Sequence, residues 1–228
     1  MVSRKWTKEK LKYHIQYDWW KYVAVLVVAV GFWSLLFTFT EPQVPPEKAL
    51  TVEMVGEPSD QNQMTKLAKK AAEDFPEMEE VTFQHIMIDG NNDANGYQML
   101  YTYVFAGVGD VYLISQKDFD NYALQAVFRP LDELIADGSL TVPEGADLTK
   151  TTLQTERDQN LGEAAKVYGI PIANLTGLQE AAGYPVADKV LALLGSSENP
   201  DNAVRMAQWL LDNLEDNPIR LVGPNAAP

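Results

Sequence analysis

The chain contains no cysteine and only two histidines among its 228 residues. Without cysteine it has no disulfide, no thiolate metal site and no lipid-modified cysteine anchor. It also lacks G-x-S-x-G, H-E-x-x-H and Walker-loop motifs. His14 lies in a basic N-terminal segment, and His85 lies inside a predicted strand, where a hydrogen-bonded core histidine is the expected role. We therefore expect a protein that is not an enzyme and that has no cofactor or metal.

A second absence is that of charge between Tyr22 and Thr40, where the sequence is YVAVLVVAVGFWSLLFTFT. A helix of that length, at ~1.5 Å per residue, reaches ~28 Å, close to the ~30 Å hydrocarbon core of a bilayer. Residues 1–21 carry six basic and two acidic side chains, a net charge of +4. Basic residues beside a span favour the cytoplasmic side. Residues 22–40 are therefore predicted to cross the cell membrane once, with residues 1–21 cytoplasmic and the rest of the chain extracytoplasmic.

Two other interpretations of this apolar run fit the sequence less well. A cleaved secretory signal has an apolar core of ~7–15 residues followed by a small-residue cleavage site. Here the run is longer, and the following residues, FTFTEPQVPPEK, contain no A-x-A pattern. A buried core helix is the other possibility, but so long an uncharged run is hard to bury in a small domain. The sequence favours a membrane anchor that contacts the lipid bilayer through residues 22–40.

The remainder of the chain is strongly acidic. Beyond residue 21 there are 12 basic and 30 acidic side chains, a net charge of −18. Such a surface argues against nucleic acid as a partner and against adhesion to anionic lipid. Residues 41–48 are rich in proline and predict a short, stiff, extended stalk. Residues 49–216 are then expected to form one extracytoplasmic domain, and residues 217–228 a flexible tail.

Strand-like and helical patterns alternate through the predicted domain. Strands are predicted at 49–55, 81–89, 110–115, 166–173 and 188–197, although the last segment is also rich in the helix formers Leu and Ala. Helices are predicted at 59–75, over 97–105, near 117–125, after Pro130 and from Pro200. This order indicates an α/β fold with a mostly parallel sheet flanked by helices. Residues 137–165 are polar with little periodicity, so they are either partly ordered or functional.

Polar residues mark the predicted helix starts. Ser59 or Asp60 can cap the first helix of the domain, and Asn199 before Pro200 can cap the last. The loop containing Asp89, Asn91, Asp93 and Asn95 has the spacing of positions 1, 3, 5 and 7 of a calcium-binding EF-hand loop. Position 6 is alanine instead of glycine, and position 12 is leucine instead of glutamate. We therefore expect a strand-to-helix loop in which Asp93 or a neighbour caps the helix.

Two acidic pairs are candidates for catalytic groups. Asp118 with Asp120 and Asp132 with Glu133 stand at predicted helix starts, where carboxylates face the positive end of the helix dipole. General acid–base catalysis needs a cleft and a perturbed pKa, which these pairs do not indicate.

The succession of motifs resembles a known family. The run AGVGDVYLISQKDFDNYALQAVFRPLDELI resembles the first lobe of bacterial extracellular solute-binding proteins of ABC importers. VYGIPIA resembles the segment where those chains leave the first lobe, and SENPDNAVRMAQWLL a later helix. Those proteins close two lobes on a solute, but only fourteen residues separate Ala173 from Asp188, too few for a second lobe. The resemblance therefore implies a single lobe with one wall of the cleft missing.

In open α/β sheets, ligands bind beyond the carboxyl ends of the strands. That rule, applied to the predicted strands, gives the rim of any small-molecule pocket. The predicted rim consists of Glu57, Ser59, Asn91, Asn92, Ser115, Gln116, Ile172 and Asn174. Tyr97 and Tyr112 would either add aromatic surface there or pack in the core.

Three functions follow from these observations. The first is a membrane-anchored extracytoplasmic binding or interaction module that docks an envelope or membrane protein. The second is an accessory subunit of a membrane transporter complex, whose span packs among other helices. A weak solute-binding protein is a variant of the first, and a hydrolase using the acidic loops is the third.

Overall fold

The computed structural model describes residues 8–40, 44–57, 59–90 and 93–214, which fall into two units divided after Gln43. The first unit contains helix α1 (Lys8–Thr40). Between Trp19 and Phe37 this helix is long and apolar enough to cross a membrane, and none of that stretch is buried. A core helix of a soluble protein would be mostly buried, so the exposed stretch is consistent with a membrane anchor or a signal sequence.

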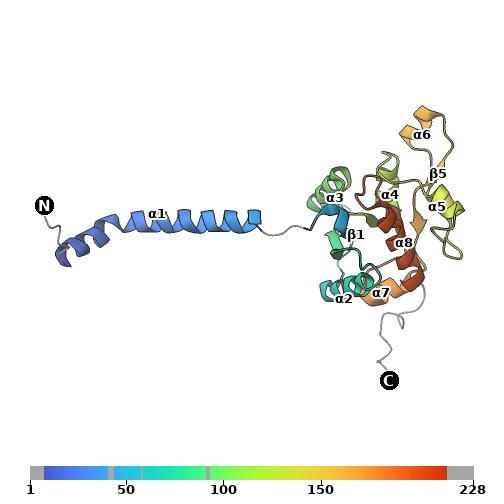
Figure 1. Cartoon of the computed structure of the whole chain (residues 1–228). Helices are drawn as coiled ribbons and strands as arrows, with labels where there is room; N and C mark the ends of the chain where they lie inside the picture. The colour runs from blue at the N-terminus through green and yellow to red at the C-terminus, as the bar shows by residue number, and fades with distance from the viewer. Residues whose placement is uncertain (1–7, 41–43, 58, 91–92, 215–228) are drawn as a thin grey trace, which may run out of the picture. The chain divides into compact units, whose positions relative to one another are not determined.

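The second unit, called here the α/β unit, begins at Val44. Its elements in chain order are the 3₁₀ turn η1 (Pro46–Lys48), β1 (Ala49–Gly56), α2 (Gln61–Ala72), β2 (Glu80–Met87), α3 (Ala94–Ala106), β3 (Val111–Ser115), α4 (Gln116–Ala123), α5 (Asp132–Ala136), the 3₁₀ turn η2 (Leu148–Lys150), β4 (Thr152–Leu153), α6 (Glu156–Leu161), β5 (Lys166–Val167), β6 (Ile170–Pro171), α7 (Thr176–Ala182), β7 (Lys189–Leu193) and α8 (Pro200–Leu214) (Figure 1).

The main sheet has five strands in the order β2-β1-β3-β7-β6. β1 pairs in parallel with both β2 and β3, with Val52 opposite Phe83 on one side and Val111 on the other. β7 runs antiparallel to both of its neighbours, β3 and β6. The prediction of an α/β fold with a mostly parallel sheet is confirmed, and β7 is the strand that runs the other way.

Alternation along the strands divides the core into two clusters. Leu50, Val52 and Met54 of β1 belong to a cluster shared with α2, α7 and α8, whereas Val55 belongs to a cluster shared with α3 and α4. Successive strand residues point to opposite faces of a sheet, so helices cover both faces. Figure 1 shows α2 and α7 side by side, and these two helices are in contact. Trp209 of α8 is buried in the first cluster.

The helix starts follow the predicted capping. Asp60 accepts hydrogen bonds from the backbone of Asn62 and Gln63 at the start of α2, and Asp93 accepts one from Gly96 at the start of α3. Both caps are confirmed. The side-chain amide of Asn199 donates to the carbonyl oxygens of Pro46 and Ala49 at 2.6 and 2.8 Å, and its role as the cap of α8 stays a prediction.

That contact shortens the predicted stalk. Residues 41–48 were expected to be extended, but Pro46–Lys48 forms a 3₁₀ turn held against the α/β unit by Asn199. Proline suits the first position of such a turn because its fixed φ and missing N–H cost nothing there. Residues 41–43, the tail 217–228 and residues 1–7 of the predicted cytoplasmic segment lie outside the described residues.

The predicted strand 166–173 is wrong as a single element. Lys166–Val167 forms β5, which pairs with β4 in a separate two-stranded sheet, and Ile170–Pro171 forms β6 of the main sheet. Gly169 lies between them in close contact with β7, because a Cβ there would be 2.4 Å from the Val190 side chain. Proline lacks the N–H that would extend the ladder. The chain therefore changes sheets at this point.

Candidate functional site

The candidate site lies at the edge of the main sheet where β1, β2, β3 and β6 end. β7 runs the other way and begins there with Lys189. Glu57 follows β1 and is exposed, Ser115 ends β3, and Gln116 begins α4. Ile172 and Asn174 follow β6, and Ser59 lies between β1 and α2. The topology thus brings the ends of these strands to one edge, while Asn91 and Asn92 lie outside the described residues.

Several of the predicted rim side chains bond to the unit itself. Ser115 caps α4, and its Oγ donates to Asp118 Oδ2 at 2.6 Å. Gln116 Nε2 donates to Asp120 Oδ1 at 2.8 Å and to the Lys150 carbonyl oxygen at 2.9 Å. These bonds hold α4 and the η2 turn in place, so both side chains have structural roles in this arrangement.

The remaining rim residues differ from one another in burial and in hydrogen bonding. The Ser59 hydroxyl donates to the Met64 sulfur at 2.8 Å, and Ile172 is fully buried in the core. Asn174 is half-buried and begins the connection to α7. A role for the eight rim residues in ligand binding stays a prediction. Tyr112, considered as pocket surface or core, is fully buried, and its hydroxyl donates to the Val108 carbonyl oxygen at 2.5 Å.

A buried lysine, which the sequence reasoning missed, lies at this edge. Lys189 is only 6 % exposed, and its Nζ donates to the Val55 carbonyl oxygen at 3.2 Å. The Tyr184 hydroxyl lies 2.8 Å from the same carbonyl and 2.7 Å from that of Leu113, and the Lys189 Nζ is 5.5 Å from the Tyr184 ring centre. These two side chains tie β1, β3 and β7 together. A lysine opening the apolar run KVLAL was the available signal.

Gly56 makes room for this lysine. Its φ is +128°, and a Cβ at this position would lie 2.7 Å from the Lys189 Nζ. On the β2 side, His85 Nε2 lies 3.2 Å from the Gly56 carbonyl oxygen, so the expected hydrogen bond is confirmed, whereas the ring is half-buried and not part of the core. Burial lowers the pKa of His85, and the positive charge of Lys189 lowers it further. The edge therefore holds one buried cation beside a histidine that favours its neutral form.

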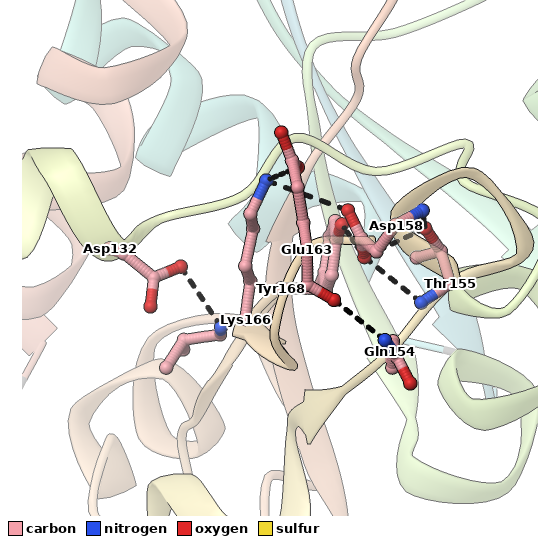
Figure 2. Close-up of polar contacts among 8 residues, drawn as sticks. Asp132, Gln154, Thr155, Asp158, Glu163, Lys166 and Tyr168 are labelled. Carbon is pink, nitrogen blue, oxygen red and sulfur yellow. Dashed lines mark hydrogen bonds and ion pairs between the residues drawn. The ribbon is translucent and has the colours of Figure 1, made fainter. Parts of the chain in front are cut away.

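A second cluster lies in the polar segment 137–165, which is ordered through η2, β4 and α6. Asp158 is its centre, as Figure 2 shows. Its carboxylate accepts hydrogen bonds from the Thr155 N–H at 2.9 Å, the Thr155 hydroxyl at 2.8 Å and the Tyr168 hydroxyl at 2.6 Å. Lys166 Nζ lies 3.5 Å from Asp158 and also pairs with Glu163.

These contacts decide the charge of Asp158. Burial alone would raise its pKa, but the hydrogen bonds from Tyr168 and Thr155 and the charge of Lys166 outweigh burial and hold the pKa at about 2. Of the donors around the carboxylate, Thr155 belongs to the segment, whereas Lys166 of β5 and Tyr168 follow it. The neighbouring Asp132 carboxylate accepts from the Val167 N–H at 3.1 Å (Figure 2). The cluster fastens the segment to β5, which is a structural role.

A third feature is a pair of buried acids on β1 and before β3. Glu53 is fully buried, and neither of its carboxyl oxygens has a hydrogen-bond partner. Asp110 is 5 % exposed and accepts from the Thr51 N–H at 2.8 Å and from Ser197 Oγ at 2.5 Å. Burial, followed by the charge of Asp110, raises the pKa of Glu53 to about 7. Sequence reasoning overlooked Glu53, although an acid inside ALTVEMVG was the signal.

Within the described residues, no group of three or more His, Asp or Glu side chains could hold a metal ion. In the loop with EF-hand spacing, the Asp93 carboxylate already accepts from the N–H groups of Asp89 and Gly96, at 3.1 and 3.0 Å. Its hydrogen bonds are those of a helix cap.

Comparisons with known proteins add a resemblance of fold. No family model and no curated protein matches the chain. Among solved structures, it is similar to an extracellular solute-binding protein of family 1 from Alicyclobacillus acidocaldarius, with 15 % identity, a TM-score of 0.40, and 57 % of this chain and 29 % of that chain covered. A solute-binding protein from Agrobacterium vitis S4 with bound D-mannitol gives 20 % identity, a TM-score of 0.36, and 54 % and 26 % coverage.

A substrate-binding protein from Listeria monocytogenes, solved with cycloalternan, gives 17 % identity, a TM-score of 0.32, and 53 % and 28 % coverage. The matches thus span less than a third of the length of these proteins. The chain resembles one lobe of a solute-binding protein, and the likeness concerns the fold alone.

Proposed function

We propose that this protein is a membrane-anchored interaction module. In this proposal α1 crosses the cell membrane, residues 1–21 are cytoplasmic, and the α/β unit docks a membrane or envelope protein on the extracytoplasmic side. The observation that carries it is the stretch from Trp19 to Phe37, which is apolar and has no buried residue. Keeping so long an apolar stretch in water is unfavourable in free energy, whereas the hydrocarbon core of a bilayer accommodates it. The net charge of +4 before the span supports the orientation.

Two features support docking of a protein over capture of a small solute. The polar side chains of Ser115 and Gln116 at the sheet edge are bonded within the unit. The short connection from Ala173 to Asp188 contains the helix α7, which packs against α2 and α8. A pocket that binds a small molecule tightly encloses ~70–90 % of the ligand surface, and one lobe offers a single wall.

The absence of cysteine makes the anchor and its orientation directly testable. Single cysteines placed at Ser3 and at Thr65, which is exposed on α2, would be treated with a membrane-impermeant maleimide on intact cells. We expect labelling of Thr65→Cys and, only after permeabilisation, of Ser3→Cys. The opposite pattern would reverse the orientation. Mass spectrometry of the carbonate-washed membrane fraction should find the full mass of 25.4 kDa, whereas a shortened, released chain would identify a cleaved signal sequence.

A further inference from the structure

The two edges of the main sheet differ in how they are protected. β6 forms one edge, is two residues long, ends in Pro171, and its Ile170 is fully buried. β2 forms the other edge, and its eight residues pair with β1 on one side, while no strand of the described chain pairs with the other side. Shortness, proline and cover are the usual protections of an edge, because an edge strand presents unpaired N–H and C=O groups to any extended chain. β6 has these protections, whereas β2 is long and open.

β2 also lacks the side chains that normally block pairing. From Val81 to Ile88 the sequence is VTFQHIMI, without lysine, any other charged residue or proline. Charged residues and proline are the common means of keeping a second chain from an edge strand. The β-branched and aromatic residues in this run instead favour extended pairing. The outer side of β2 therefore has the composition of a strand that accepts another strand.

The hydrogen bond at the start of β2 shows which backbone N–H groups face the open side. The Glu79 N–H donates to the Lys48 carbonyl oxygen at 2.9 Å, so it points towards β1. Successive N–H groups of a strand point alternately to its two sides. The N–H of Phe83 therefore faces β1, and that of Gln84 faces outward. The Gln84 side chain is exposed as well, so an approaching chain can reach this position.

A groove of about 370 Å³ lies between β2 and α2. Residues 80–84 line it on the strand side, and Thr65, Ala68, Lys69 and Ala72 are among the residues that line it on the helix side. Because the two alanines are small, they leave space beside the strand. A chain paired with β2 would lie ~4.8 Å from it and would direct every second side chain to the α2 side of the sheet. The groove is positioned to receive those side chains.

The charges at the two ends of β2 are different. Near its start, Glu80 and Lys69 both line the groove, so an acid and a base lie together. Asp89 follows the end of β2, Glu57 follows the end of its partner β1, and both are exposed. Lys189 is buried and bonded to β1. The exposed charge at the end of β2 is therefore acidic, and basic residues complement it.

We propose that β2 binds an extended segment of a partner protein, which joins the main sheet as a sixth strand. The segment that fits has an uncharged middle with apolar side chains at alternate positions, and Lys or Arg at the end that lies beside Asp89 and Glu57. In such contacts main-chain hydrogen bonds provide affinity, and the alternate side chains provide specificity. The inference rests on the proposed function for docking of a protein, and it deepens that function by naming the chemistry of the docked segment.

This site favours an extended basic segment over two other occupants. A helix satisfies its backbone groups internally, so it offers no free N–H and C=O groups to an edge strand. A second copy of this chain carries a net charge of −18 beyond residue 21, so two copies repel one another. The same charge attracts a partner segment that ends in Lys or Arg.

Binding of a defined peptide to the full chain in mild detergent tests the pairing. The probe is a fluorescein-labelled peptide of about ten residues, with alternating valine and threonine and lysine at one end, followed by fluorescence polarisation. Gln84→Pro removes the outward N–H and keeps the bonds to β1, since proline is tolerated on an edge strand where its N–H would face solvent. We expect Gln84→Pro to weaken binding at least about tenfold, and Gln84→Ala, which keeps the N–H, to change it less than about twofold.

A second pair of variants leaves the strand untouched. Thr65 and Thr102 are matched, because both are exposed on a helix and both hydroxyls donate to the carbonyl oxygen four residues earlier, at 2.9 and 2.8 Å. Lysine is a better helix former than threonine, so both lysine variants should fold. Thr65→Lys fills the groove with a charged side chain and should weaken binding about tenfold, whereas Thr102→Lys on α3 should not. Thermal melts monitored by circular dichroism check the fold of every variant.

Amide hydrogen exchange measured by NMR locates the bound peptide. Pairing should slow exchange of the outward N–H groups of Thr82 and Gln84, and leave that of Phe83, which already faces β1, unchanged. Protection at Ser115 and Gln116 instead would place the peptide at the candidate site and overturn the proposal. No binding to the unmodified chain at millimolar peptide, or equal binding by a folded Gln84→Pro variant, would overturn it as well.

The natural partner is tested in membranes of the cells that make the protein. Thr65→Cys carrying a benzophenone maleimide should cross-link another protein, at a peptide with alternating apolar residues and a basic end. The product should be lost with Gln84→Pro and kept with Gln84→Ala. A product of two copies of this chain, or one that survives Gln84→Pro, would contradict the proposal. Failure of the anchor is read separately, because a chain released by carbonate washing that still binds the peptide would refute the membrane anchor and support the pairing.

Discussion

Glu53 in β1 and Asp158 in α6 are both buried carboxyl groups, but their surroundings are opposite. Asp158 accepts three hydrogen bonds from Thr155 and Tyr168 and lies near Lys166, so its pKa is held at about 2. Glu53 has no hydrogen-bond partner and an acidic neighbour, Asp110, so its pKa is raised to about 7. Both groups lose hydration on folding. Only one of them gains donors in return.

The comparison shows that burial by itself does not set the charge of a side chain. Removing a carboxylate from water disfavours its charged form, and hydrogen bonds to that form reverse the preference. Around Asp158 the charge is part of the structure, and it fastens the segment from Thr155 to Tyr168. At Glu53 the neutral form is favoured below about pH 7. The two sites should therefore respond in opposite ways to mutation and to pH.

Removing the Asp158 carboxylate should have the largest effect. Asp158→Ala leaves the Thr155 N–H, the Thr155 hydroxyl and the Tyr168 hydroxyl without their acceptor, and should lower the free energy of unfolding by about 3–5 kcal/mol. Urea unfolding of the full chain in mild detergent, followed by circular dichroism, measures this. Asp120→Ala is the control, because Asp120 is exposed and accepts a single bond from Gln116. Equal costs for the two variants would refute the role assigned to the Asp158 network.

Glu53 should make the unit less stable as pH rises. Its folded pKa of about 7 lies above the ordinary value of 4.5. The stabilising contribution of the protonated form is thus fully present below pH 4.5 and is lost as pH rises through about 7. The expected loss between pH 4.5 and 8 is up to about 3 kcal/mol. Measured at pH 5 and pH 8, Glu53→Gln should remove this part of the pH dependence.

The control for Glu53 is Glu80→Gln, at the exposed start of β2. Because the Glu80 carboxylate is hydrated in the folded chain, its replacement should leave the pH dependence as in the unmodified protein. If Glu53→Gln behaves like Glu80→Gln, then Glu53 is charged when folded, and its contrast with Asp158 disappears.

For Asp158 the expected pH dependence is opposite to that of Glu53, because stability should be lost as pH falls. Its folded pKa of about 2 lies below the ordinary value of 3.8. The stability that its charged form provides is therefore present above pH 3.8 and is lost as pH falls towards 2. This shift is smaller than that of Glu53, so the effect should be smaller as well. Limited proteolysis near residues 155–168 between pH 4 and pH 2 would detect the loss, and unchanged protection at pH 2 would contradict it.

How far the sequence predicts these features depends on how local their causes are. The caps at Asp60 and Asp93 lie within four residues of the groups they bind, and both were predicted. The contacts of Lys189 and Tyr184 with Val55 join residues 134 and 129 positions apart, so the lysine that opens KVLAL signals burial but does not identify its partner. The continuous run KVYGIPIA likewise gave one predicted strand, because the close approach of Gly169 to Val190 is visible only in three dimensions.

In the candidate site, too, the features with local causes were predicted and those with distant partners were not. Strand ends were predicted well enough to place Glu57, Ser115 and Gln116 at one edge of the sheet. The bonds of Gln116 to Asp120 and Lys150 were not predicted, since the second partner is 34 residues away. The acid inside the apolar strand was a signal that Glu53 is buried, but its lack of hydrogen-bond partners depends on side chains from several elements.

A carboxylate at the surface provides the smallest effect and completes the comparison. Asp74 is exposed, and its Oδ2 accepts a hydrogen bond from the Trp209 Nε1–H at 2.7 Å. Asp74→Ala removes this acceptor while the indole ring stays packed in the core, and water can reach the exposed position instead. The cost should therefore be about 1 kcal/mol or less. Urea unfolding beside Asp158→Ala measures the difference. A cost for Asp74→Ala as large as that for Asp158→Ala would mean that the number of donors and the degree of burial do not govern these carboxylates, and that the contrast between Asp158 and Glu53 has another cause.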